Sequence, residues 1–554
     1  MKGTPDDETP AIAEGEAAQT TSIGAAGTLA TERSPQSGNR LDLAFFLILA
    51  AGVTIRFLAL DQQSFEWDEV ESVTMRWRGG DAGLLTVLRD PHGPIYLALL
   101  KGWMTVFGQA DGAVRTLSAV LGSVGLVLFY RIALPLVGRA TALVGLALLA
   151  SSPFYLYYSQ WARGYALVFD LGLLAVPAFV ADVKRRTPGT FLTAFLTTLA
   201  ACLANLTGFF LLVLHAVYAL AVGRRSHYPI RRLLLFLVLA GAILWPWAMR
   251  ATGSTADLSL GRPDEGSGVR IAKGDSPPGL LSIPFTFYNF SLGYSVGPSI
   301  TELKIHRFPA ARPHLWYLIP IGVLFVLAAL QGARRVSRST LPLLVTWVAV
   351  PVLLMAGLSA LNLKAPNARY AILAFAPYLL LVAAGVTSIG NRALRTALLC
   401  VLLLFSAYAD YQYFTNPRYW RPDVRSAGEL ITRQAKPDDV VVFYTLGYPK
   451  YYFGRDIDYV KPMPRDFASE RAMERWLRSN TKDKSRVWLV QCFSWWIDRE
   501  DKLLHLCQRV MIPAGEWQFT ELPVYLFEKP GDWESRDSAG EAAREPTRDP
   551  PSAQ

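Results

Sequence analysis

The sequence predicts an α-helical polytopic membrane protein of about eleven spans, with an outer juxtamembrane helix and a small C-terminal extracytoplasmic α/β domain. Of its 554 residues, 52% are hydrophobic and 18% are charged, whereas ordinary soluble domains carry about 25% charged residues. The apolar residues gather in runs of roughly 17–22, the length that a helix needs to cross a bilayer. The net charge of +10 lies mostly in short clusters between these runs, so it does not indicate a nucleic-acid partner.

Eleven apolar segments are candidate spans. They cover residues 41–60, 114–132, 140–158, 164–182, 188–203, 206–222, 231–250, 314–332, 340–358, 368–387 and 393–411. Cationic residues stand at alternate junctions, among them Lys184, Arg225 and Arg334. Because cytoplasmic loops carry an excess of Lys and Arg, this order places the N-terminus in the cytoplasm and the C-terminal part outside. The expected location is the inner or cell membrane of a bacterium.

The segment from His92 to Phe107 is apolar but short, and we do not count it as a span. It opens with Gly93-Pro94 and carries Lys101. Counted as a span, it would invert every later loop and move the cationic clusters to the outside. We therefore expect a juxtamembrane or re-entrant helix on the outer side.

Polar segments flank the membrane domain of residues 41–411. Residues 1–40 are predicted to be a disordered cytoplasmic tail, and residues 531–554 a second disordered tail. Residues 251–313 form a long Gly/Pro/Ser-rich segment, and loops of this length are usually lids or disordered. The part at 284–294 is rich in Phe and Tyr, which favours a place in the membrane interface.

Residues 412–530 have the pattern of a small extracytoplasmic α/β domain. We expect an amphipathic helix at 421–434 and strands at 439–444, 486–491 and 524–527. Cys492 and Cys507 lie in this domain without a zinc-binding spacing. The sequence leaves open whether they form a disulfide on an oxidising side of the membrane.

A cluster of carboxylates follows the first apolar segment. Residues 65–69 read Phe-Glu-Trp-Asp-Glu, and His92 follows in the same outer loop. Asp68 and Glu69 stand where a helix could begin, so one interpretation is that they complement the N-terminus of that helix. Carboxylates beside a low-dielectric wall also act as general bases or metal ligands. His92 is either a turn residue or a functional one.

Cations and polar side chains also gather in two further outer loops, against the general charge rule. These residues are Gln160, Arg163, Tyr165, Lys364, Arg369 and Tyr370. A single arginine at a helix end most often extends to the membrane interface. An outward cation between apolar spans also suits a phosphate headgroup, through bidentate hydrogen bonds. The residues alone leave both interpretations open.

These motifs follow one another in a particular order. Trp67-Asp68-Glu69 comes after the first span, and His92-Gly-Pro opens an apolar helix. Tyr158-Ser-Gln-x-x-Arg163-x-Tyr165 follows, and Asn367-Ala-Arg-Tyr370 opens a late span. This succession resembles the polytopic GT-C glycosyltransferases, specifically the relatives of glycosyltransferase family 39, which include protein O-mannosyltransferases and the lipid A aminoarabinose transferase.

The resemblance implies that Asp68 is the catalytic carboxylate, with Glu69 beside it. It also implies a polyprenyl-phosphate sugar as donor, with its phosphate held by basic residues of the outer loops. The expected reaction transfers the sugar with inversion to a hydroxyl of an acceptor lipid, glycan or protein. No cofactor beyond this lipid is expected, no metal ligand is assigned, and the need for a divalent metal stays open. Of the other acids, Glu66 and Glu71 are expected to be solvated.

Two other function classes compete with the enzyme. A polytopic lipid or glycan transporter or flippase without transferase activity needs ionisable groups within its spans, near the midplane. The notable charges here lie in loops at one face. A sensor needs a cytoplasmic output domain, for which only residues 1–40 are available. The placement of charge therefore favours the enzyme.

Overall fold

The computed structural model describes most of the chain between residues 35 and 533. The described residues are 35–74, 90, 93–226, 228–255, 279–306, 308–361, 363, 366–445, 447–453, 457–467, 469–496, 498, 500–531 and 533. Residues 45–554 form one compact unit, and its boundary with residues 1–44 falls inside α1 (Pro35–Phe57). Helix α1 begins before residue 41, so residues 35–40 are helical and not part of a disordered tail.

Each of the eleven predicted spans coincides with helical structure. The helices are α1, α5 (Asp111–Val137), α6 (Arg139–Ala150) with α7 (Pro153–Ser159), α8 (Tyr165–Arg185), α9 (Pro188–Ala204), η1 (Leu206–Phe209) with α10 (Phe210–Ser226), α11 (Ile230–Thr255), α15 (Leu315–Arg335), α16 (Leu341–Ala360), η5 (Ala368–Ala374) with α17 (Phe375–Thr387), and α18 (Arg392–Thr415). Among the described residues, seven helices are long and apolar enough to cross a membrane, or eight if the bent pair α6–α7 is one span. The apolar helices at 43–57, 188–204 and 206–222 are shorter. The polytopic helical fold is confirmed, and the count of eleven stays a prediction.

The break between α6 and α7 has a local cause. Ser152 has extended backbone angles, its hydroxyl accepts a hydrogen bond from the Tyr155 amide, and Pro153 follows at the first helical position. This is a standard start for a new helix, because proline lacks the amide that a continuing helix would need. The two helices bend by 61° at this point.

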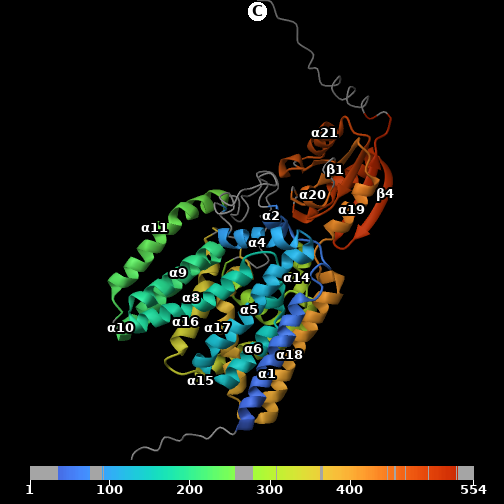
Figure 1. The fold of residues 1–554 in the computed structure, drawn as a ribbon. Coiled ribbons are helices and arrows are strands. Elements are labelled where there is room, and N and C mark those ends of the chain that lie inside the picture. The colour runs from blue at the N-terminus through green and yellow to red at the C-terminus, as the bar shows by residue number, and fades with distance from the viewer. Residues whose placement is uncertain are drawn as a thin grey trace, which may run out of the picture. The chain divides into compact units, whose positions relative to one another are not determined.

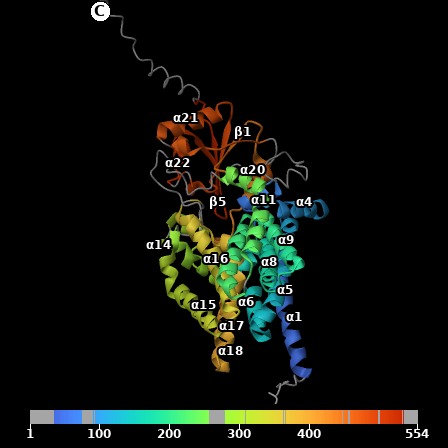
Figure 2. The same ribbon diagram turned by 90° about the vertical axis from the view of Figure 1, so that its left-hand side faces the viewer.

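Helices α15 and α17 lie side by side (Figures 1 and 2) and approach each other through glycines. A Cβ atom on Gly385 would overlap the carbonyl group of Ala328, and one on Gly332 would overlap that of Leu381. Side chains at these positions would force the two backbones apart. Close contact between small residues is a common way to join helices in membrane proteins.

We expect Gly385→Val to lower the amount of folded protein, since overpacking of a tight contact costs on the order of 1–3 kcal/mol. Gly357→Val is the matched control, because the position of its Cβ in α16 is open. The test is the thermal unfolding midpoint in detergent, followed by size-exclusion chromatography. Equal midpoints for the two variants would contradict the tight α15–α17 contact.

In the described part of the connection between the first two spans lie two short helices, α2 (Trp67–Val73) and α4 (Pro94–Phe107). A helix is thus present in the segment predicted to be juxtamembrane, and it packs against α2, α5 and α9. Gly93 precedes it with φ 123°, a left-handed conformation that favours glycine, and Pro94 occupies its first turn. Its position relative to a membrane stays a prediction.

The segment at 251–313, expected to be a lid or disordered, is not disordered in its described part. Residues from 279 onward form η3 (Gly279–Leu281), α12 (Ser282–Leu292), α13 (Ile300–His306), α14 (Phe308–Ala311) and η4 (Arg312–His314). Phe290 and Leu292 are buried in the main core, not in an interface. The aromatic residues here recur at helical spacing, so they form a packing face. Residues 256–278 lie outside the described residues.

The C-terminal residues form the expected α/β structure, built on a five-stranded mixed sheet of order β2-β1-β3-β5-β4. The strands are β1 (Asp439–Phe443), β2 (Asp458–Val460), β3 (Arg486–Val490), β4 (Ile512–Phe519) and β5 (Leu522–Glu528). Strand β1 pairs in parallel with β2 and β3, and β5 pairs antiparallel with β3 and β4. The helices are α19 (Val424–Gln434), α20 (Gly447–Tyr452), α21 (Glu470–Thr481) and α22 (Lys502–Val510).

The two faces of this sheet belong to different cores. Val440 and Val442 of β1 face a core with α21 and α22, whereas Val441 and Phe443 face a core that includes side chains of α2, α4 and α19. Helix α20 also packs against α2 (Figure 1). The two cysteines of this domain are free and buried. Cys492 lies in the core shared with α2, α4 and α19, and Cys507 lies in the core with α21 and α22. The C-terminal domain thus contributes directly to the surroundings of the acidic loop.

Candidate active site

Helix α2 presents the predicted carboxylates. Glu66 precedes it with extended backbone angles, and the Glu66 amide donates to Glu69 Oε2 at 2.9 Å. Asp68 and Glu69 both lie in the first turn, where the partial positive charge of the helix N-terminus favours acids. Of the two acids considered from the sequence for a capping role, Glu69 has that role, and its partner in it is Glu66. This pairing leaves the Asp68 carboxylate available for other contacts.

The Asp68 carboxylate lies between two arginines that the sequence had singled out. Arg369 Nη1 donates to Asp68 Oδ2 at 2.8 Å, and Arg163 Nη2 lies 3.7 Å from Asp68 Oδ1. Arg163 also donates to the Ser72 hydroxyl at 3.2 Å. The three charged side chains keep 16–20% of their surface exposed. The structure thus gathers an acid and two cations from distant parts of the chain, each partly exposed.

Aromatic rings fix the position of Arg369. Its guanidinium carbon lies 4.8 Å from the ring centre of Trp161, 5.4 Å from Tyr370 and 5.7 Å from Tyr165. The rings of Trp161 and Tyr165 are themselves stacked, with their centres 5.5 Å apart and an angle of 11° between their planes. Rings around a cation attract it and reduce its freedom to rotate. Two of the predicted substrate-binding residues, Tyr165 and Tyr370, therefore hold a cation, and Trp161 is a member that the sequence analysis missed.

Glu69 has a different environment from Asp68. Its carboxylate is fully buried and accepts bonds from Arg115 Nε and Nη2, each at 2.9 Å, from Arg421 Nη1 at 2.5 Å and from the Ala162 amide at 3.0 Å. Burial alone would raise the pKa of Glu69, but the charges of Arg115 and Arg421 outweigh it and lower the pKa. Glu69 is thus a buried anion whose carboxylate is fully occupied by hydrogen bonds from protein groups.

Arg115 extends this set of hydrogen bonds to the backbone of the loop before α2. It donates to the carbonyls of Leu60, Gln63 and Ser64 at 2.7–2.9 Å. One buried arginine therefore ties the loop, α5 and Glu69 together. These contacts hold α2 in the orientation that presents Asp68.

The remaining predicted site residues divide into two groups. Gln160 is buried, and its Nε2 donates to the carbonyls of Arg56 and Leu58 at 3.1 and 2.8 Å. These bonds secure the end of α1, and the role of Gln160 in substrate binding stays a prediction. His92 and Lys364 lie outside the described residues. Among the residues that the structure does describe, no group of three His, Cys, Asp or Glu side chains is suited to hold a metal ion.

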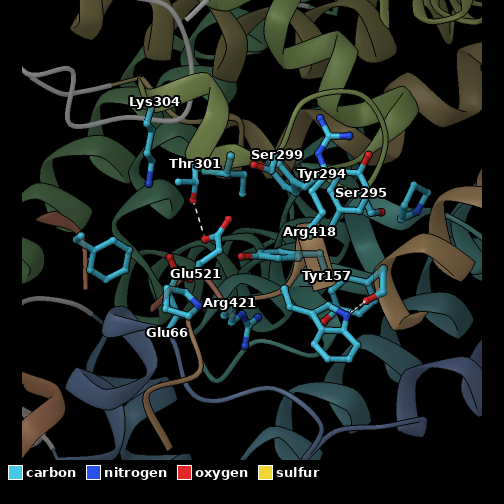
Figure 3. Close-up of a pocket in the computed structure, with 17 residues that line it drawn as sticks. Glu66, Tyr157, Tyr294, Ser295, Ser299, Thr301, Lys304, Arg418, Arg421 and Glu521 are labelled. Atoms are coloured by element: carbon cyan, nitrogen blue, oxygen red, sulfur yellow. Dashed lines mark hydrogen bonds between the residues drawn. The ribbon is translucent and has the colours of Figure 1, made fainter. Parts of the chain in front are cut away.

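Glu66 is not solvated as expected; it lines a pocket (Figure 3). Its Oε2 is buried and has no hydrogen-bond partner among the described residues. Burial raises the pKa of Glu66, and the negative charge of Asp68 raises it further. The sequence could not show this, because the walls of the pocket come from α13 and from the C-terminal domain.

A second acid of the pocket, Glu521, lies at the turn between β4 and β5. It accepts a hydrogen bond from the Thr301 hydroxyl at 2.8 Å, and burial raises its pKa to about 7. A carboxyl group with a raised pKa in the folded state favours folding while it is protonated. This contribution is complete below the unfolded pKa and is lost as pH rises through about 7.

We therefore expect Glu521→Gln to raise the thermal unfolding midpoint at pH 8 more than at pH 5. The neutral amide avoids the free-energy cost of a buried carboxylate anion. Wild-type Glu521 carries that charge only above its raised pKa of about 7. Glu500→Gln, at an exposed position of the same domain, is the control. A stabilisation that is equal at both pH values would contradict this expectation.

A group of ionisable side chains also lies within the helix bundle, where the sequence analysis had not expected one. Arg56 is buried, donates to the carbonyls of Gly52 and Ala150, and packs over the Tyr155 ring. Asp170 and Asp410 lie within electrostatic reach of it. In the sequence, each of these residues is a single charge within a long apolar run. Only the packing of α1, α8 and α18 brings Arg56, Asp170 and Asp410 near one another.

Solved structures of similar fold help to interpret this geometry. The chain is similar to the archaeal oligosaccharyltransferase AglB from Archaeoglobus fulgidus, with 12% identity, 89% of this chain and 74% of AglB covered, and a TM-score of 0.51. The chain shares the fold of this oligosaccharyltransferase. At that identity the likeness shows the fold alone, and it confirms the fold that the motifs implied.

Other solved structures were also found. ArnT from Cupriavidus metallidurans has 14% identity over 89% of this chain and 98% of that one, with a TM-score of 0.46. The arabinofuranosyltransferase AftD from Mycobacteria has 13% identity over 89% of this chain and 40% of its own, with a TM-score of 0.49. No family model matches the sequence, and no curated protein matches it either.

Proposed function

We propose that this protein transfers a sugar from a polyprenyl-phosphate donor to a hydroxyl of an acceptor lipid, glycan or protein on the outer face of the membrane. The observation that carries the proposal is the Asp68 carboxylate held between Arg163 and Arg369 in a GT-C fold. The solved AglB structure of that fold contains a dolichol-phosphate. A lipid phosphate is a ligand that two neighbouring arginines suit.

The proposed reaction is a direct displacement with inversion. Asp68 accepts the proton of the acceptor hydroxyl as the acceptor oxygen forms a bond to the anomeric carbon. The bond from that carbon to the phosphate oxygen breaks, and its electron pair leaves with the polyprenyl phosphate. A positioned base typically contributes about 10²–10⁴-fold to the rate. The phosphate gains negative charge as it departs, so fixed cations stabilise the transition state more than the ground state.

Arg369 connects the two halves of this reaction. In the free protein it is bound to Asp68 at 2.8 Å. A donor phosphate that takes over part of this guanidinium releases the Asp68 carboxylate to accept a proton. The aromatic rings around Arg369 keep the guanidinium in place during the exchange. Donor binding would thus prepare the base.

The other predicted residues receive separate roles. His92 and Lys364 remain candidates for substrate contacts. Glu69 acts as a positioning residue, because both oxygens of its carboxylate already accept hydrogen bonds from protein groups. Nucleotide sugars do not reach the outer face, so a donor already anchored in the membrane meets the need. The N-terminus would lie in the cytoplasm of a bacterial cell and the C-terminal domain outside. That orientation follows the excess of Lys and Arg at the opposite loops.

A transporter or flippase is the second candidate, because Arg56, Asp170 and Asp410 form an ionisable group within the bundle. A flippase moves a lipid-linked sugar between leaflets without changing it. Two nitrogens of Arg56 are bonded to backbone carbonyls, which is typical of a structural role. The transferase remains the better supported function.

Mass spectrometry of envelope lipids, glycans and glycoproteins from cells with and without the gene tests the proposal. We expect one sugar to be missing from one class of acceptor in the deletion strain, with its lipid-linked donor accumulating. Restoring the wild-type gene should return the sugar. An unchanged set of acceptors would contradict transfer, and redistribution of the intact donor between leaflets would favour the flippase.

A further inference from the structure

A pocket lies beside α2, at the junction of the membrane helices and the C-terminal domain (Figure 3). Its walls come from α7, from α13 and the connection before it, from the end of α18 and the segment between α18 and α19, from the segment after β3, and from the β4–β5 turn. Charged groups and aromatic rings both line it. The residues used below are Glu66, Tyr157, Lys304, Tyr413, Arg421, Phe493 and Glu521.

Two of the lining side chains have unused hydrogen-bonding capacity. Arg421 is 7% exposed, and its Nε and Nη2 find no partner among the described residues, although its Nη1 is bonded to Glu69. Glu66 Oε2 is likewise a buried acceptor that has no hydrogen-bond partner among the described residues. Unpaired buried groups of this kind are costly, and in native proteins they often mark the place of a ligand or water.

The mixture of groups indicates the chemistry of the ligand. An anion would satisfy Arg421 and Lys304 but would face the carboxylates of Glu66 and Glu521, and a cation would have the opposite conflict. Hydroxyl groups both donate and accept, so they satisfy either kind of partner. The rings of Tyr157, Tyr413 and Phe493 offer apolar faces beside these polar atoms. A neutral sugar ring, with hydroxyls at its edge and C–H groups on its faces, matches both features.

We propose that this pocket binds a neutral sugar unit of a carbohydrate acceptor. The inference rests on the proposed transferase function, and it selects a glycan from the acceptor classes left open above. Glu66 is two residues before Asp68 and responds to its charge. Asp68 itself contacts Arg163 and Arg369, the proposed phosphate ligands. An acceptor held at Glu66 and a donor phosphate held at these arginines would thus both lie beside the proposed base, as a direct displacement requires.

A binding experiment without turnover tests the pocket. The full-length Asp68→Asn variant in nanodiscs is applied to arrayed probes: neutral hexose and pentose oligosaccharides, acidic oligosaccharides, and peptides. We expect it to retain neutral oligosaccharides. Adding Phe493→Ala or Lys304→Met should weaken that binding about tenfold, equal to about 1.4 kcal/mol. Arg433→Ala, on an exposed surface of α19, should leave it unchanged.

Each outcome decides between the alternatives. Preference for acidic oligosaccharides or for peptides, or equal binding by the pocket variants and the Arg433→Ala control, would overturn the inference. Thermal unfolding identifies a variant that fails to fold, and the other pocket variant then decides. Glycan binding by a protein that transfers nothing would remove the proposed function but leave the pocket. Transfer to a non-carbohydrate acceptor would keep the proposed function but overturn the inference that the pocket binds a sugar.

Discussion

Asp68→Asn is expected to reduce sugar transfer by about 10²–10⁴-fold, the contribution of a positioned general base. The amide has nearly the same shape as the carboxylate but does not accept the proton of the acceptor hydroxyl. It also removes the negative charge that Asp68 places beside Arg369 and Arg163 in the free protein. Because these arginines keep some exposure to solvent, the fold should tolerate that loss.

The measurement is the initial rate of transfer from purified lipid-linked sugar by protein in detergent, with equal amounts of folded enzyme. Asp61→Asn is the matched control, since Asp61 is an exposed acid in the same loop and the substitution is identical. We expect the control to keep the wild-type rate. A rate for Asp68→Asn within about threefold of wild type would exclude Asp68 as the base, given the magnitude expected for such a group.

The membrane part of the fold was predictable because one physical constraint dominates it. In a bilayer each backbone polar group needs a partner within its own segment, so a long apolar run becomes a helix. The charge rule then placed Asp68, Arg163 and Arg369 on one face, and the structure brings these three into contact. Local patterns also identified the strands β1, β3 and β5, which are buried apolar runs.

Other features depend on partners that local sequence does not reveal. Arg421 appeared to be the start of an amphipathic helix, yet it is buried against Glu69. Glu66 appeared solvated because nothing nearby in the sequence shows that the C-terminal domain closes over it. Strands β2 and β4 were missed since one is only three residues long and the other has no fully buried residue. Tertiary packing decides such cases.

Glu69→Gln is expected to cost more stability than any other single change in the acidic loop. Its carboxylate neutralises two arginines that are almost fully buried, Arg115 and Arg421. Removing one partner from a buried ion pair typically costs about 3–5 kcal/mol, because the remaining charge stays in a low-dielectric environment. The thermal unfolding midpoint should fall sharply, and much of the protein should fail to insert or should aggregate. Glu429→Gln, which breaks the exposed pair with Arg433, should change little.

The pH dependence provides an independent test of the same contact. The pKa of Glu69 is lowered in the folded protein, so its stabilising contribution is present above the unfolded pKa and is lost as pH falls through the folded value. The difference in midpoint between wild type and Glu69→Gln should therefore be large at neutral pH and shrink in acid. If Glu69→Gln instead unfolds at the wild-type temperature and loses only transfer, Glu69 acts in the chemistry beside Asp68, as the family resemblance implies. A joint loss of stability and transfer, with Asp68→Asn losing transfer alone, assigns positioning to Glu69 and the proton to Asp68.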